Sequence, residues 1–158
     1  MKNRDHETKE KLRIEAQSKS FEVLQRRLNF MCDLLHQYGE QIKSMQAITH
    51  GSLYPAFSVC KGGKCCMGCL HIEWKRYYDP AKDQKKRNAI HGRAVGEKDV
   101  KSGFHCARIK NVKSRLPVGE EHRELREVIK AFESVREQRK KLVEHLKKAL
   151  QSTYRFDC

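Results

Sequence analysis

The sequence predicts a mainly α-helical protein with a small β module, and two observations support this fold class. Apolar residues recur at helical spacing towards each end of the chain, and apolar and aromatic residues alternate with period two around a cysteine-rich segment in the middle. We therefore expect two long helices that form an antiparallel coiled-coil hairpin, joined at one end by a cysteine-rich, zinc-knuckle-like antiparallel sheet. The expected parts are an N-terminal long helix at 1–51, a basic β module at 52–117 and a C-terminal long helix at 118–158.

The N-terminal helix is predicted from an apolar seam whose members are separated by alternating steps of three and four residues. The seam consists of Phe21, Leu24, Leu28, Met31, Leu35, Tyr38, Ile42 and Met45. Residues 2–20 have few apolar anchors, so we expect them to fray or project. Gly39 interrupts the seam at a cost of about 1 kcal/mol relative to alanine and suggests a kink. Gly51 and Pro55 are expected to stop the helix.

The C-terminal helix is predicted from a second seam with the same alternating steps. Its members are Leu125, Val128, Phe132, Val135, Arg139, Leu142, Leu146 and Ala149. Arg139 is the charged member, and we expect it at the edge of the seam or paired with a carboxylate. The two seams would pack against each other, or either would pair with another copy of the chain, and the sequence leaves both arrangements open.

The β module is predicted as a hairpin with the cysteines at its tip. Phe57 and Val59 alternate before the cysteines, and Leu70, Ile72 and Trp74 alternate after them. Residues 85–91 are expected to add a basic third strand and residues 104–109 another short strand, with a loop at 92–103 between them.

A cysteine cluster occupies the predicted hairpin tip, where four of the seven cysteines fall within residues 60–69, interleaved with three glycines. Glycine allows the backbone to turn sharply, and the C-x2-C spacing of Cys66 and Cys69 suits a zinc knuckle. The sequence therefore predicts one structural zinc ion. Its candidate ligands are Cys60, Cys65, Cys66, Cys69, His71 and Cys106. The alternatives are reduced cysteines in a glycine-rich loop, or a redox pair at Cys65 and Cys66.

Positive charge is concentrated after the cysteines. The chain carries a formal net charge of +14, and residues 75–115 hold 13 basic and 4 acidic side chains. Such a block predicts a surface for a polyanion, most simply nucleic acid, although a solvated loop is the plain alternative. The candidate contacts are Lys75, Arg76, Lys85, Lys86, Arg87, Arg93, Arg108, Lys110 and Lys113. Trp74, Tyr77 and Tyr78 could stack on bases, with a core position favoured for Trp74.

Several functional classes find no support in the sequence. It has no secretory signal, no apolar run of about 20 residues, no H-E-x-x-H motif and no phosphate-binding Walker loop. We therefore expect a cytoplasmic protein that has no membrane partner and is not an enzyme. Asn88 and His91, with Asp79 and Asp83 nearby, form the best nuclease-like group, but ordinary turn and surface roles explain each of them.

The order of three motifs resembles a known group of proteins. Gly51-Ser52-Leu53 is followed by the cysteine loop at 60–69, and then by Arg115-Leu116-Pro117 before a helix. In this order the chain resembles small, basic, cysteine-containing bacterial proteins encoded in transposable elements. The resemblance implies a mobile-element setting, DNA rather than RNA as the nucleic acid, and a recombinase or transposase as a possible protein partner.

The sequence thus predicts a non-enzymatic, zinc-stabilised nucleic-acid-binding accessory protein. The principal alternative is a protein–protein adaptor whose helices dock a recombinase, a transposase or a second copy of the chain. A metal-dependent nuclease and a thiol-based redox or metal sensor are the less favoured alternatives.

Overall fold

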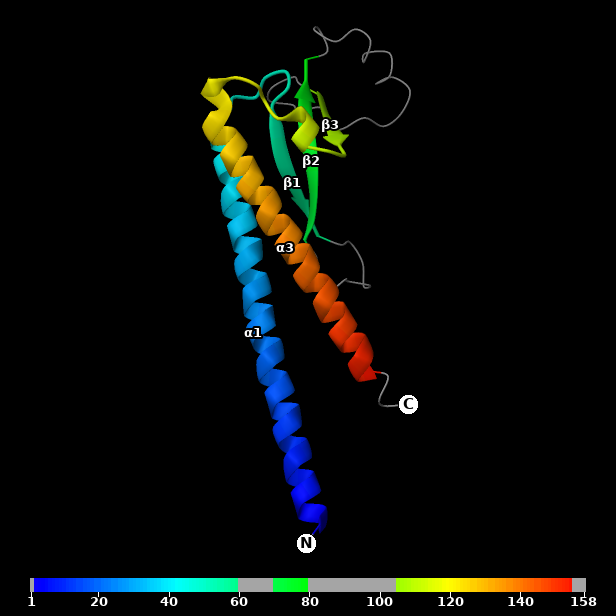
Figure 1. Ribbon diagram of the computed structural model, residues 1–158. Helices are drawn as coiled ribbons and strands as arrows, with labels where there is room; N and C mark the ends of the chain where they lie inside the picture. The colour runs from blue at the N-terminus through cyan, green and yellow to red at the C-terminus, as the bar shows by residue number, and fades with distance from the viewer. Residues whose placement is uncertain (1, 60–69, 80–104, 155–158) are drawn as a thin grey trace, which may run out of the picture.

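The computed structural model describes residues 2–59, 70–79 and 105–154 of the chain. Two long helices and a three-stranded antiparallel sheet dominate these residues (Figure 1). The elements in chain order are helix α1 (Lys2–Ser44), strands β1 (Leu53–Ser58), β2 (His71–Tyr78) and β3 (His105–Ile109), the 3₁₀ turns η1 (Lys113–Arg115) and η2 (Glu120–His122), and helix α3 (Arg123–Tyr154). This confirms the prediction of a mainly helical protein with a small sheet.

Helices α1 and α3 lie side by side and run in opposite directions, and the N-terminal part of α1 extends beyond the end of α3 (Figure 1). The seams predicted from the sequence supply much of their contact. The fully or nearly fully buried members are Leu28, Met31, Leu35, Ile42, Leu125, Phe132 and Leu146. The ends of the seams differ from the prediction, because Phe21 and Ala149 are exposed. The contact is therefore shorter than the apolar pattern.

Arg139 is buried within the helix pair, with 8% of its surface exposed, rather than at the edge of the seam. Its Nε donates to the Cys32 thiol at 3.3 Å, and its Nη1 donates to the Leu70 carbonyl at 3.3 Å. Its neighbour Arg136 donates to the Ile72 carbonyl at 3.0 Å. Helix α3 is thus bonded to the beginning of β2 and to the residue just before it.

The strands are arranged in the order β1-β2-β3, with both pairings antiparallel. Phe57 is opposite Ile72, so β1 and β2 form the predicted hairpin around residues 60–69, and β3 confirms the short strand expected at 104–109. Pro55 lies in β1, an edge strand, where a residue without a backbone N–H is tolerated. The strand expected at 85–91 and the loop at 92–103 lie outside the described residues.

The sheet lies beside the helix pair, towards the end where α1 finishes and α3 begins (Figure 1). Trp74 and Phe57 both meet Phe132 edge-on, with ring centroids 5.2 Å and 6.1 Å apart. The Trp74 indole N–H donates to the Glu133 carboxylate at 2.7 Å. Ile129, which the predicted seam omits, is 1% exposed because it joins this core between α1, α3 and the sheet.

Gly39 allows α1 and β1 to approach closely. A Cβ atom added there would lie 2.7 Å and 2.9 Å from two ring carbons of Phe57, well inside normal van der Waals contact. The glycine that suggested a kink in the sequence therefore makes room for an aromatic ring of the sheet.

Candidate nucleic-acid interface

The two faces of the sheet have different chemistry, because alternate side chains of a strand point to opposite sides. In β2, Ile72 and Trp74 belong to the face that packs on the helices. The intervening residues, such as Lys75 and Tyr77, therefore belong to the outer face. By their register, Tyr54 of β1 and Cys106 and Arg108 of β3 lie on this outer face too.

A stacked pair of tyrosines is the main aromatic feature of the outer face. The rings of Tyr54 and Tyr77 lie 4.7 Å apart at an interplanar angle of 22°, and both residues are half-buried. A hollow of about 340 Å³ adjoins them, and it is also lined by Lys43 and Ile48 from the end of α1 and the turn after it. The site therefore combines aromatic rings with a cation and an open space beside them.

The phenol of Tyr54 is held in its neutral form. Burial raises its pKa above the ordinary value of 10.0, and hydrogen bonding with Cys106 and Tyr77 raises it further. A tyrosine is already neutral at physiological pH, and the raised pKa extends the neutral form of Tyr54 to more alkaline conditions.

Lys75 and Arg108 place positive charge beside the tyrosines. Lys75 is the direct cross-strand partner of both Tyr54 and Arg108. Arg108 forms an ion pair with Glu73 at 3.1 Å across an exposed surface. Lys110 follows β3 directly and is exposed. The structure thus gathers three of the predicted cationic contacts at or next to the outer face.

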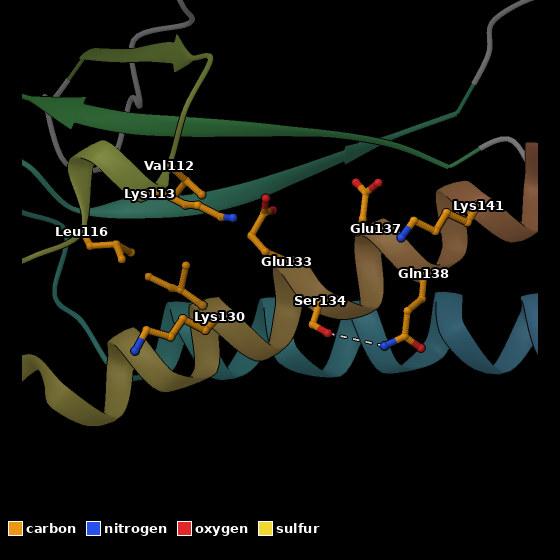
Figure 2. A pocket seen from close by; sticks show the side chains of 10 residues that line it. Val112, Lys113, Leu116, Lys130, Glu133, Ser134, Glu137, Gln138 and Lys141 are labelled. Carbon is orange, nitrogen blue, oxygen red and sulfur yellow. Dashed lines mark hydrogen bonds between the residues drawn. The ribbon is translucent and has the colours of Figure 1, made fainter.

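Two further predicted cations lie elsewhere. Arg76 belongs to the helix side of β2, opposite Leu53 of β1. Lys113 borders a groove of about 480 Å³ along α3, and Figure 2 shows its side chain directed towards Glu133. Glu137 also lines this groove (Figure 2). Carboxylates at these positions make the groove a poor surface for a polyanion, so Lys113 is less suited to that role than its sequence position suggested.

The structure also assigns the aromatic residues that the sequence could not place. Trp74 is 3% exposed and Tyr78 is buried, so neither is available for stacking on a base. This confirms the core position favoured for Trp74. Tyr77 remains on the outer face, and its partner Tyr54 was missed, although it alternates with the core residues Leu53 and Pro55 in the sequence.

Several predicted site residues lie outside the described parts of the chain. They are the cations Lys85, Lys86, Arg87 and Arg93 and the thiols Cys60, Cys65, Cys66 and Cys69. Within residues 2–59, 70–79 and 105–154, no three side chains of histidine, cysteine, aspartate or glutamate gather in a way that could hold a metal ion.

The two described candidates for zinc ligation lie at opposite ends of β2. His71 begins the strand and pairs with Ser58 at the end of β1, next to the cysteine segment. Cys106 is buried and lies opposite Tyr77, six residues further along the strand. At about 3.3 Å per residue, the two positions are roughly 20 Å apart along the sheet.

Comparison of the chain with family models, with curated proteins and with solved structures finds no match. No helix in the described part of the chain combines the length and apolar character needed to cross a membrane.

Proposed function

We propose that the protein is a non-enzymatic nucleic-acid-binding accessory protein that uses the outer face of its sheet. The observation that carries this proposal is the stacked Tyr54–Tyr77 pair beside Lys75 and Arg108. Aromatic rings stack on unpaired bases and neighbouring cations neutralise phosphates, a combination typical of surfaces that bind single strands. The preference for DNA and the mobile-element setting rest on the sequence resemblance.

The test is binding of single-stranded and duplex DNA and of RNA, measured by fluorescence anisotropy over a range of salt concentrations. Each neutralised phosphate contributes about 0.7 to the log–log salt slope on single strands and about 0.9 on duplex DNA. The double substitution Lys75→Ala with Arg108→Ala should therefore lower the slope by up to about 1.4–1.8. The matched control is Lys140→Ala with Lys148→Ala, which removes two exposed cations from α3 and should leave the slope unchanged.

The tyrosines are tested separately from the charges. Tyr77→Ala removes a stacking ring and should cost about 1–3 kcal/mol of binding free energy to a single strand, whereas Tyr77→Phe retains the ring and should bind nearly as well. If the protein bound none of these nucleic acids at low salt, the proposal would be refuted.

A zinc knuckle at the hairpin tip is part of the proposal. The pairing of Ser58 with His71 brings the two ends of the intervening cysteine segment to neighbouring positions, which favours convergence of its thiols. We propose Cys60, Cys66 and Cys69 as ligands. For the fourth, the arrangement of β2 favours Cys65 or His71 over the distant Cys106.

The adaptor function remains a second candidate because α1 exposes apolar side chains on a separate face. Leu12, Val23 and Phe30 are 61%, 63% and 64% exposed. At about 100° per residue their spacings of 11 and 7 place them on one side of the helix. We propose that α1 and α3 pack as a coiled coil and that this side docks a protein. If it docks a second copy, Val23→Glu with Phe30→Glu should lower the mass measured by sedimentation equilibrium.

A further inference from the structure

A second concave site lies on the helix side of the sheet, and it shares Gln46, Ala47, Ser52 and Leu53 with the hollow beside the stacked tyrosines. Its volume is about 490 Å³. It is enclosed by the turn that follows α1, by β2 and by the segment that leads into α3. Its ionisable lining residues are Arg76, Arg115, His50 and His122, and no carboxylate side chain is among the described residues that line it.

Arg76 lies in this site with unused hydrogen-bonding capacity. Its Nε is buried and has no hydrogen-bond partner among the described residues, and its guanidinium forms no ion pair with any of them. The guanidinium carbon lies 5.4 Å from the centre of the Tyr78 ring. Because the buried Nε has almost no accessible surface, hydrogen bonds to an anion in the cavity would come from the other guanidinium nitrogens, and a guanidinium without a described carboxylate partner favours such an anion.

Gly51 provides the space for this arginine. Its φ of +96° is in the left-handed region that favours glycine, and a Cβ there would lie 3.3 Å from Nη2 of Arg76. The turn is fixed to β2, because the Gly51 N–H donates to the Tyr77 carbonyl at 2.8 Å and the Tyr77 N–H donates to the Ser52 carbonyl at 2.9 Å. The cavity wall beside the guanidinium is therefore preformed.

His50 lines the site and in its neutral form has one ring N–H to donate. The Asp79 backbone N–H donates to His50 Nδ1 at 3.1 Å, so the proton of the neutral ring resides on Nε2. On the opposite wall, Arg126 donates to the carbonyls of Pro117 and Gly119, which fixes the segment that carries Arg115 and His122. The walls of the site are thus held by hydrogen bonds outside the cavity.

We propose that this cavity binds a phosphomonoester, with Arg76 and Arg115 as the charge partners of the phosphate and His50 as an additional donor. Guanidinium groups match the oxygen geometry of phosphate, and two of them suit a dianion better than a carboxylate. The apolar lining residues Met45 and Leu116 leave room for an organic group attached to the phosphate. Its arginines are not the cations of the proposed sheet interface, although the two hollows share lining residues. The phosphate could belong to a strand end or to a small metabolite.

The experiment is calorimetric titration of the full chain with inorganic phosphate and with a nucleoside monophosphate, at constant ionic strength and with acetate as the reference anion. We expect saturable binding of both phosphates and none of acetate. Arg115→Gln and Arg76→Gln should each weaken binding at least tenfold. Lys113→Gln, which removes an exposed cation outside this cavity, should leave it unchanged.

The variants are checked for folding by circular dichroism, and Arg115 is exposed, so its substitution tests the site even if Arg76→Gln does not fold. A 5′-phosphorylated oligonucleotide that binds more tightly than its 5′-hydroxyl form would identify a strand end as the source, whereas equal binding of both would exclude a strand end and leave a small phosphorylated compound. Retention of phosphate binding in the Lys75→Ala, Arg108→Ala variant separates this site from the sheet face. Absence of phosphate binding by the wild type, or undiminished affinity in Arg115→Gln, would overturn the proposal.

Discussion

Replacing Gly39 with alanine tests how closely the sheet and α1 are fitted together. Alanine in a helix is favoured over glycine by about 1 kcal/mol, so an exposed Gly39 would be a stabilising site for this change. In the structure the new methyl group would lie 2.7 Å from the Phe57 ring. That ring also lies against His36 and Phe132, with centroids 4.3 Å and 6.1 Å away, so displacing it would disturb both contacts.

Forcing a methyl group into a packed core costs about 1–3 kcal/mol, which exceeds the gain in helix propensity. We therefore expect Gly39→Ala to lower the free energy of unfolding by about 1–2 kcal/mol, measured by urea denaturation followed by helical circular dichroism. Combining it with Phe57→Leu should recover part of the loss, giving a coupling free energy of about 1 kcal/mol in a double-mutant cycle.

The control is Gln37→Ala, at an exposed position of the same helix, which should change stability by less than about 0.5 kcal/mol. A Gly39→Ala protein that is about 1 kcal/mol more stable than the wild type, with no coupling to Phe57, would refute the close approach of helix and sheet.

Three further predictions concern the core, the aromatic pair and the metal. Leu35→Ala should cost about 2–5 kcal/mol of unfolding free energy because the side chain is fully buried, whereas Phe30→Ala on the exposed side should cost little in urea denaturation. Because the pKa of Tyr54 is raised, its neutral form stabilises the fold below pH 10, and this contribution is lost as the pH rises further. Absorbance titration should show one late-ionising tyrosine, and this late step should be absent in Tyr54→Phe. Zinc should be found at one ion per chain by elemental analysis, and chelation should lower the melting temperature; a zinc-free protein with the same melting curve would exclude the knuckle.

The sequence predicts those parts of the fold that depend on neighbours along the chain. The seam residues Leu28 and Phe132 follow from helical spacing, and the pairing of Phe57 with Ile72 follows from alternation around the cysteines. Ile129 was missed because a two-helix arrangement has no place for it, and it becomes core only when the sheet adds a third surface.

The same reason explains what was missed at the sites. The interpretation of Gly39 as a kink did not predict its contact with Phe57, because Phe57 belongs to β1 and not to the helix. Tyr54 could have been assigned to the outer face, since it alternates with apolar residues, but its stacking on Tyr77 depends on strand register. The cavity around Arg76 is formed by the turn after α1, by β2 and by the segment before α3. These segments are far apart in the sequence, so local residue spacing cannot predict that they come together.

The hydrogen bond between Arg139 and Cys32 has a practical consequence for studying the cysteine segment. Arg139 also donates to the carbonyl of Leu70, the first described residue after that segment. The guanidinium of Arg139 therefore bridges the Cys32 thiol on α1 and the residue at which the segment rejoins the fold. A rearrangement that moves Leu70 would disturb this guanidinium and the hydrogen bond that it donates to the half-buried Cys32 thiol. The alkylation rate of Cys32, followed by mass spectrometry, therefore reports on structural change at Leu70 beside the cysteine segment. No label needs to be introduced.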